Sequence, residues 1–513
     1  MRAWHRIIFL MVSFALFLGV SSCSSKNGSS NNFLYVKAIY SMPVSYDPIK
    51  MNDGASLAFS ELVYEGLARY SEDFNAIPAL AESWTTSSDG LVMTFKLNPK
   101  AKFHDGSKVT ALDVKVSLSR AVSPESVVFK YYDVIKGAKE YHSNKANEVE
   151  GLKVVDEQTI EIDLVKPFPP MIYILAGATA KVFPANKLKD SSFFHSPVGS
   201  GPFKISTIEK DRILLERFDG YYGIKPELKK MSLELNDQTV AMKKAKEGLV
   251  HDLSLWPMNG KEEVFKTGQD VQGIMADTWI VGMNTRFAHF NDLKVRKLFK
   301  KSIDADKFRK TFYPDAKTAW GYIPNGYTGH ISEKVETQKT NGKIPQNLIT
   351  IAIPEELDQS ETIKKFFEDE LRTKSWNVKV EKMKWAEMMA KYEKKELQAF
   401  FFAMNVDYPD SEFLLSNFES TNPDNFSGIK DKTIDSLVEK SRSIQDRIAR
   451  QKVQEELAKR INDLSLTANL IHSRSHYWLN RCVEGFKPNL LAVAYTDYRT
   501  VRFNEECMRE ERR

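Results

Sequence analysis

Apolar and polar positions alternate with two different periods along the chain, and each period predicts one kind of element. In "GASLAFSELVYEGLARYS" (54–71) the apolar residues recur at helical spacing, which predicts a helix. In "LVMTFKLN" (91–98) they alternate with polar residues, which predicts a strand. From about 345 to 406 the pattern predicts strand, helix, strand, helix and strand in turn. This order indicates a mixed α/β fold.

Turn and cap signals mark the ends of further elements. The stretch "TALDVKVSLSRA" begins with Thr110 and carries Asp113 at its fourth position, a start that is typical of a capped helix. Residues 151–170 form two strand patterns joined at "DEQ", and residues 196–223 combine a Gly/Pro loop with a hairpin pattern. These signals extend the α/β pattern over most of the chain.

The first residues have the pattern of an export signal. Arg2 and Arg6 precede an apolar run from Ile7 to Leu18. That run is as long as the apolar core of a signal peptide and shorter than the roughly 20 residues that span a membrane. The stretch from Ser24 to Asn32 holds no apolar residue, so it is expected to be a flexible tether. Residues 1–22 are therefore predicted to be a signal peptide.

The residues around Cys23 resemble the lipobox of bacterial lipoproteins. In such proteins the cysteine of a sequence like "VSSC" is lipidated and becomes the first mature residue. The resemblance implies that Cys23 is lipidated, that 23–32 form a tether, and that the protein is anchored in the cell envelope, facing the periplasm or the exterior. The alternative is an ordinary signal peptide with an incidental cysteine. The sequence does not distinguish an inner from an outer membrane.

Composition and charge narrow the class of protein. The chain of 513 residues is 42% hydrophobic and 27% charged, and at about 150 residues per domain it suggests roughly three domains. Its net charge of +5 is small for this length, and Lys and Arg are mixed with Asp and Glu. No nucleic-acid partner is therefore expected.

Two cysteines remain besides Cys23. An exported protein meets an oxidising compartment, so Cys482 and Cys507 are predicted to form a disulfide. The alternative is a pair of independent buried thiols.

Motifs for catalysis and metal binding are not found in the sequence. The nine histidines are scattered, and no GxSxG, HExxH or Walker-type loop occurs. His472 and His476 stand four residues apart, but their flanks have strand character, which would separate them by ~13 Å. The protein is therefore expected not to be an enzyme, and neither a metal nor a cofactor is expected.

Several stretches in a fixed order resemble the extracellular solute-binding proteins of family 5, the oligopeptide- and dipeptide-binding components of ABC importers. The resemblance covers the chain from about Tyr35 to Phe503. The stretches that carry it are "VYEGLARYSEDFNAIPALAESW", "LVMTFKLNPKAKFHDGSKVTALDV", "SPVGSGPFKI", "NTRFAHFNDLKVRKLFKKSID" and "MNVDYPDSEFLLSNF".

The resemblance implies a periplasmic-binding-protein-like fold (type II, cluster C) in which two lobes close about a hinge and a third domain is added to the first lobe. It implies a discontinuous lobe I made of 33–75, 195–283 and 483–513. The extra domain is then 76–194, and lobe II is 284–482. A monomer is expected.

The resemblance also implies a ligand site in "MNVDYPD". In peptide-binding relatives an aspartate in a matching segment accepts the α-ammonium group of the ligand, and here it would be Asp407. The neighbouring ligand-binding residues would be Met404, Asn405, Val406 and Tyr408, and Trp385 would be a cleft tryptophan. The strand-like backbone of 404–406 would pair with an extended peptide. The alternatives are that "DYPD" is only a turn and that Trp385 packs in the core.

The chain departs from the family pattern at the far end of the ligand. Met404 replaces the usual tryptophan, and Tyr392 and Phe401 replace basic residues that can receive a peptide carboxylate. How the far end of a ligand is held therefore stays open.

Together these features predict a lipid-anchored substrate-binding protein that captures peptides and delivers them to the permease subunits of an ABC transporter. Two alternatives stay open. One is a binding protein for a non-peptide solute, such as a metal chelate, an opine-like compound or a sugar. The other is an envelope sensor or chaperone lipoprotein that is not coupled to import.

The lipobox resemblance generates the first testable prediction. Replacement of Cys23 by alanine should release the protein from the membrane fraction, or leave it with an uncleaved signal peptide, because the thiol that carries the acyl chains is lost. Membrane fractionation with mass analysis of the N-terminus measures this. A variant that is processed normally and stays as firmly in the membrane as the wild type would contradict the prediction.

Overall fold

A computed structural model describes residues 33–254, 263–333, 342–488, 495–505 and 507. Residues 33–513 form one unit, separate from 1–32. Cys23 and the predicted signal peptide and tether lie outside the described residues. Among the described residues, no helix is both long and apolar enough to cross a membrane.

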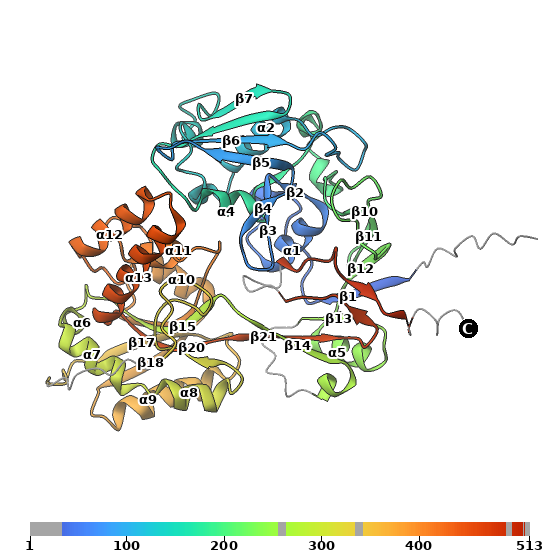
Figure 1. Cartoon of the computed structure of the whole chain (residues 1–513). Coiled ribbons are helices and arrows are strands. Elements are labelled where there is room, and N and C mark those ends of the chain that lie inside the picture. Colours follow the sequence, from blue (N-terminus) through green and yellow to red (C-terminus); the bar gives the residue numbers. More distant parts are fainter. Residues whose placement is uncertain (1–32, 255–262, 334–341, 489–494, 506, 508–513) are drawn as a thin grey trace, which may run out of the picture. The chain divides into compact units, whose positions relative to one another are not determined.

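A seven-stranded mixed sheet contains the beginning of the described chain (Figure 1). β1 lies inside it, parallel to β12 on one side and to β13 on the other. In spatial order the strands are β10 (Phe203–Ile208), β11 (Arg212–Arg217), β12 (Lys230–Leu235), β1 (Leu34–Ile39), β13 (Asp252–Leu253), β21 (Arg474–Leu479) and β14 (Gln269–Ile274). The helices α1 (Gly54–Val63) and α5 (Gln238–Lys246) belong to this part of the chain.

A four-stranded antiparallel sheet has a core of its own (Figure 1). Its strands are β5 (Ala81–Thr86), β6 (Val92–Leu97), β8 (Thr159–Asp163) and β7 (Leu152–Asp156). Its helices are α2 (Ala111–Ala121), α3 (Ala138–His142) and α4 (Met171–Ala176). Thr110 and Asp113 form the expected capping box at the start of α2. This sheet lies within the predicted extra domain, 76–194.

A six-stranded sheet carries the second half of the chain. Its strands are β16 (Lys317–Thr318), β20 (Thr467–His472), β15 (Asp277–Met283), β19 (Ala399–Asn405), β17 (Ile349–Pro354) and β18 (Val378–Met383). The helices of this part are α6 (Ala288–Asn291), α7 (Leu293–Ser302), α8 (Ala305–Phe312), α9 (Ser360–Arg372), α10 (Trp385–Glu393), α11 (Glu412–Leu415), α12 (Lys432–Ser443) and α13 (Arg447–Asp463). The predicted α/β alternation from 345 to 406 is confirmed by β17, α9, β18, α10 and β19.

Three two-stranded ladders complete the described sheets. They pair β2 (Glu65–Gly66) with β9 (Lys181–Val182), β3 (Ala68–Tyr70) with β4 (Ala76–Pro78), and β22 (Val483–Glu484) with β23 (Arg502–Phe503). The fold is therefore of the mixed α/β class, as predicted.

The six-stranded sheet is buried on both faces, and the sequence of β19 shows why. Phe401 joins the core that contains α8 and α9, whereas Phe400 and Phe402 join the core that contains α12 and α13. Side chains of a strand alternate between the two faces of its sheet. The uninterrupted apolar run "AFFFAM" therefore supplies both cores at once.

The predicted helix over 54–71 is wrong beyond Val63. The chain leaves α1 there and forms β2 and β3. A Cβ atom on Gly66 would approach the carbonyl oxygens of Ala180 and Leu175 to 3.0 Å. The glycine therefore allows a close backbone approach to the 175–182 segment, and that tertiary contact overrides the helical pattern.

The chain changes from one large sheet to the other at two places. β14 leads into β15, and β20 leads into β21, with only one or two residues between the strands of each pair. β15 thus belongs to the sheet of the second half, and β21 to the sheet of the first half. The predicted limits at 283 and 482 place these two strands in the other lobe. The difference arises because each crossing is an almost continuous strand, which offers no turn signal to the sequence.

The structure joins Cys482 to Cys507 by a disulfide, with 5.6 Å between the Cα atoms. The bridge lies beside the ladder of β22 and β23, where Val483 pairs with Phe503. The aromatic ring of Phe503 contacts Tyr35 of β1. The disulfide therefore holds the last strand next to the seven-stranded sheet.

This geometry generates the second prediction. Digestion of the mature protein without reducing agent should yield one peptide pair that links Cys482 to Cys507, as identified by mass mapping. A variant with both cysteines replaced by serine should lose about 3 kcal/mol of unfolding free energy, because the closed loop restricts the unfolded chain. Free thiols at both positions in the exported protein would contradict the prediction.

Candidate ligand-binding cavity

A cavity of about 560 Å³ is lined by residues from both large sheets. This volume lies in the range of sites for small ligands. One wall comes from β1 and the loop after it, from the first turns of α1 and from the residue that follows β13, with Lys37, Ala38, Ile39, Tyr40, Ser41, Gly54, Ala55, Leu57, Ala58 and Ser254. The other wall comes from β15, β17, α10 and β19 and their flanks, with Met275, Asp277, Trp279, Pro354, Glu356, Leu357, Trp385, Phe402, Ala403 and Asn405.

Trp385 and Asn405 are the two predicted ligand-binding residues that line this cavity. Trp385 is the first residue of α10, and its side chain is 45% exposed. Both carboxylate oxygens of Glu356 accept its backbone N–H, at 2.9 and 3.0 Å, and its ring packs edge-on against Phe402. Trp385 is therefore a surface of the cavity rather than a core residue.

Three other predicted residues place their side chains in the protein interior. Met404 and Val406 belong to the apolar core below β19. The Tyr408 side chain is also buried, and its hydroxyl donates to Glu412 at 2.8 Å. At these three positions only the backbone is therefore available for contact with a ligand.

Beyond Phe400, the backbone of β19 has one side that pairs with no other strand in the described part of the chain. Val406 donates its N–H to the carbonyl of Ala276 at 2.9 Å. Residues of an antiparallel strand turn their N–H and C=O groups alternately to its two sides. Asn405 and Ala403 therefore turn theirs away from β15.

On that other side the ladder with β17 is short. The register of β17 with β19 ends where Ala352 pairs with Phe400. Further along β17, Pro354 has no N–H to donate, so the ladder does not extend toward Ala403. The cavity is lined by Pro354 and Ala403, which places this open part of β19 at its wall.

Asp407 lies two residues beyond Asn405 and does not itself line this cavity. Its side chain remains accessible to solvent, although it is surrounded by protein. The resulting desolvation raises the pKa of the carboxyl group above its ordinary value, against the opposing effects of a hydrogen bond from Tyr131 and the charge of Lys130. A carboxylate in such a position favours a cationic partner.

The hydroxyl that donates to Asp407 comes from the part of the chain that holds the four-stranded sheet. Tyr131 ends the short 3₁₀ helix Phe129–Tyr131 and donates to the Asp407 carboxylate. The hydrogen bond joins residues 276 positions apart. Sequence reasoning missed Tyr131, because "VVFKYYDV" contains no pattern that points to a partner so distant.

The two residues that replace the expected basic groups pack on opposite faces of the six-stranded sheet, Phe401 buried and Tyr392 half-buried. Phe401 is fully buried between α8 and α9. Tyr392 packs edge-on against Phe400 on the opposite face of the sheet. The structure thus leaves these positions without a positive charge.

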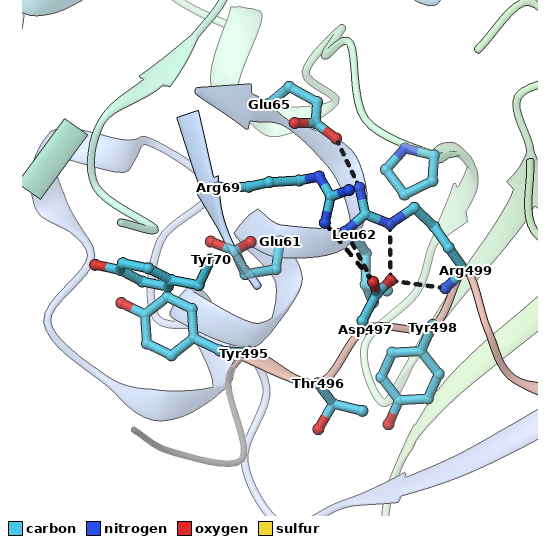
Figure 2. A pocket seen from close by; sticks show the side chains of 11 residues that line it. Glu61, Leu62, Glu65, Arg69, Tyr70, Tyr495, Thr496, Asp497, Tyr498 and Arg499 are labelled. Atoms are coloured by element: carbon cyan, nitrogen blue, oxygen red, sulfur yellow. Dashed lines mark hydrogen bonds and ion pairs between the residues drawn. The ribbon is translucent and has the colours of Figure 1, made fainter. Parts of the chain in front are cut away.

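A second, much smaller pocket contains a cluster of charged side chains (Figure 2). The Arg499 guanidinium contacts Asp497 at 2.7 Å and Glu65 at 3.6 Å, and Arg69 approaches Asp497 at 4.0 Å. The pocket measures about 30 Å³, which is space for water but not for a peptide. We interpret these contacts as attaching the segment 495–499 to α1, β2 and β3.

The two histidines with metal-ligand spacing are separated by the fold. His472 ends β20 in one sheet, and His476 lies in β21 of the other. Nowhere in the described part of the chain do three or more His, Cys, Asp or Glu side chains form a group that could hold a metal ion.

Two linked sheets with a cavity at their crossing suit a protein that binds a small ligand between them. Residues 75–426 match the family model of the bacterial extracellular solute-binding proteins, family 5. The chain therefore belongs to this family, a family of binding proteins rather than enzymes.

Comparisons with individual proteins agree with this assignment. The chain is 30% identical over 304 residues to the glutathione-binding protein GsiB of Pectobacterium atrosepticum, a match that covers 56% of each chain. It is 24% identical over 509 residues to the dipeptide-binding protein DppE of Bacillus subtilis, with 87% and 89% covered. The match to the GsiB relative thus spans only about half of that protein's length.

Solved structures share the fold. The murein tripeptide binding protein MppA in its unliganded open form superposes with a TM-score of 0.80 at 20% identity, over 92% of this chain and 98% of MppA. The predicted periplasmic-binding-protein-like fold is thereby confirmed.

The contact between Tyr131 and Asp407 generates the third prediction. A hydrogen bond to the ionised carboxylate favours that form, so replacement of Tyr131 by phenylalanine should raise the pKa of Asp407 further. Carboxyl-carbon NMR titration of the ligand-free protein measures this, with Asp407→Asn to assign the signal. An unchanged or lowered pKa in the variant would show that the hydroxyl does not contact this carboxylate in solution.

Proposed function

We propose that this protein captures short peptides in the cavity between its two large sheets and delivers them to the permease subunits of an ABC transporter. We also propose that it is anchored to a membrane through a lipid on Cys23. The observation that carries the peptide proposal is the open side of β19, which runs from Asp407 past Asn405 and Ala403 into the cavity wall.

An extended peptide has the chemical groups that match this open side. It offers one N–H and one C=O per residue at about 3.3 Å spacing, the same repeat as β19. Addition of the ligand as a further strand satisfies the backbone groups of Ala403 and Asn405. This mode gives affinity from main-chain hydrogen bonds and makes little demand on the sequence of the peptide.

Asp407 lies at one end of the open side of β19. Because the pKa of its carboxyl group is raised by desolvation, the carboxylate gains from a cationic partner. An α-ammonium group at the peptide's amino end is such a partner, and it forms charge-assisted hydrogen bonds. The Tyr131 hydroxyl, which donates to Asp407 in this structure, would then share the carboxylate with the ligand or be displaced by it.

The similar proteins support a ligand of this kind. Their names refer to glutathione, a dipeptide and a murein tripeptide. The exposed ring of Trp385 and the apolar side chains around it would contact the peptide's side chains without charge selection.

The fourth prediction tests the role of Asp407. Titration calorimetry should show that tetra-alanine binds the wild-type protein and that N-acetylation of the peptide weakens binding strongly. Asp407→Asn should lose about 2–5 kcal/mol of binding free energy for the free peptide, because one partner of a desolvated charge pair is removed. N-acetylation should cost the variant little, since both changes remove the same interaction.

Asp358→Asn is the matched control, because Asp358 is exposed and does not line the cavity. It should bind free and acetylated peptides as the wild type does. Equal affinity of the wild type for free and acetylated peptides would contradict the role of Asp407. Absence of peptide binding, combined with a non-peptide solute in native mass spectra of protein from its own host, would favour the alternative class of ligand.

A further inference from the structure

We infer that Lys37 binds a carboxylate of the ligand at the inner wall of the cavity, with Ser254 beside it. The inference rests on the proposed function and extends it, because the family positions that could neutralise a carboxylate hold Tyr392 and Phe401 here. It assigns the far end of the ligand to the seven-stranded sheet instead of to the six-stranded sheet, whose strand β19 leads to Asp407.

Lys37 has an unusual place for a lysine. It lies in β1, inside the seven-stranded sheet, and its side chain is only 6% exposed. Of the described residues that line the cavity, it alone carries a positive charge. A lysine is rarely buried without partners for its ammonium group, so its contacts decide what the group can bind.

Two of the three ammonium hydrogens have acceptors within the described part of the chain. Nζ donates to the Oδ2 atom of Asp252 at 2.8 Å and to the Oγ atom of Ser254 at 3.1 Å. These two contacts hold the amino group in place. The third donor is the one through which Lys37 can serve a group in the cavity.

The Asp252 carboxylate has a second hydrogen-bond donor besides Lys37. The Oδ2 atom that accepts the ammonium also accepts the hydroxyl of Tyr498. Asp252 is fully buried and does not line the cavity, whereas Lys37 and Ser254 do. A ligand therefore meets the ammonium and the hydroxyl, and the carboxylate stays behind them.

The two acidic side chains of the cavity wall are occupied by protein donors. Asp277 accepts the backbone N–H of Ser473 at 2.9 Å and also its hydroxyl. Glu356 receives the backbone N–H of Trp385 on both oxygens. These contacts direct both carboxylates toward the protein, so they do not replace the ligand as partners of Lys37.

The start of α1 lies at the same wall of the cavity as Lys37. Gly54 and Ala55, the first residues of this ten-residue helix, line the same cavity. Asp53 caps the N–H of Ser56, and a Cβ atom on Gly54 would meet nothing within 4 Å. The Asp53 carboxylate therefore compensates the positive end of this helix, and the attraction for an anion at this wall comes from Lys37.

The direction of β19 connects the two ends of the ligand. A peptide whose amino group is held at Asp407 and whose backbone pairs with Asn405 and Ala403 enters the cavity with its later residues. The carboxylate it carries there is either the C-terminal one or an acidic side chain. Both present the same chemistry to Lys37.

The test compares three peptides by titration calorimetry: tetra-alanine, its C-terminal amide, and the amide with glutamate in the third place. Wild type should bind the free acid at least about tenfold more tightly than the amide, as expected for a buried charge pair. If the glutamate restores the lost affinity, the side chain is a second source of the carboxylate; if it does not, the C-terminus is the source.

The variant Lys37→Met should bind acid and amide alike. This single variant leaves Asp252 buried without its cation, which destabilises the fold. The double variant Lys37→Met with Asp252→Asn replaces the ion pair by two neutral side chains of similar size, so the test does not depend on the stability of the single variant. Lys181→Met is the matched control, since Lys181 is an equally buried lysine paired with Glu61 at 2.7 Å outside the cavity. It should keep the preference for the acid.

Equal affinity of wild type for acid and amide would overturn the role of Lys37, and so would a double variant that still prefers the acid. In both cases the effect of N-acetylation would persist if the proposed function is correct. Loss of that effect as well would overturn both.

Discussion

A buried carboxylate holds together the two segments of chain that cross between the large sheets. Asp277 opens β15, and Ser473 is the single residue between β20 and β21; the Asp277 carboxylate accepts both the N–H and the hydroxyl of Ser473. Burial raises the pKa of Asp277 to about 6. A buried carboxylate is costly unless donors compensate it, so this contact keeps the two crossing strands side by side. The cavity is formed at this crossing, with Asp277 in its wall.

The periodic parts of the fold could be predicted from the sequence, and the crossings could not. Strands and helices from 349 to 405 follow directly from their apolar patterns, because each pattern is local. The helix predicted over 54–71 ends early, because contacts of Gly66 with the 175–182 segment are not visible in its own neighbourhood. The limits of the lobes shift for a related reason: the strands that cross are nearly continuous, and local signals mark only turns.

The candidate site, too, has one part that the sequence predicts and another that it does not. The family resemblance located Asn405 and Trp385 at the cavity, and Asp407 close to it, whereas the side chains of Met404, Val406 and Tyr408 serve the core. A resemblance identifies a segment but not which atoms of it face a ligand. Tyr131 and Lys37 were missed because their partners lie 276 and 215 residues away. Only the folded chain brings Tyr131 to Asp407 and Lys37 to the cavity wall.

The short ladder between β17 and β19 has a consequence for the behaviour of the protein in a crowded envelope. A strand with free N–H and C=O groups is a template on which other chains aggregate. Here the ladder with β17, which reaches Phe400, and the end of β19 at Asn405 limit the free stretch to a few residues, and the neighbouring strands β15 and β17 lie on either side of β19 within the sheet. A flat sheet edge from another molecule cannot align with so short an internal segment, but a single thin chain can. The internal position of β19, which leaves room for one ligand chain, thus also protects the protein from unwanted strand exchange.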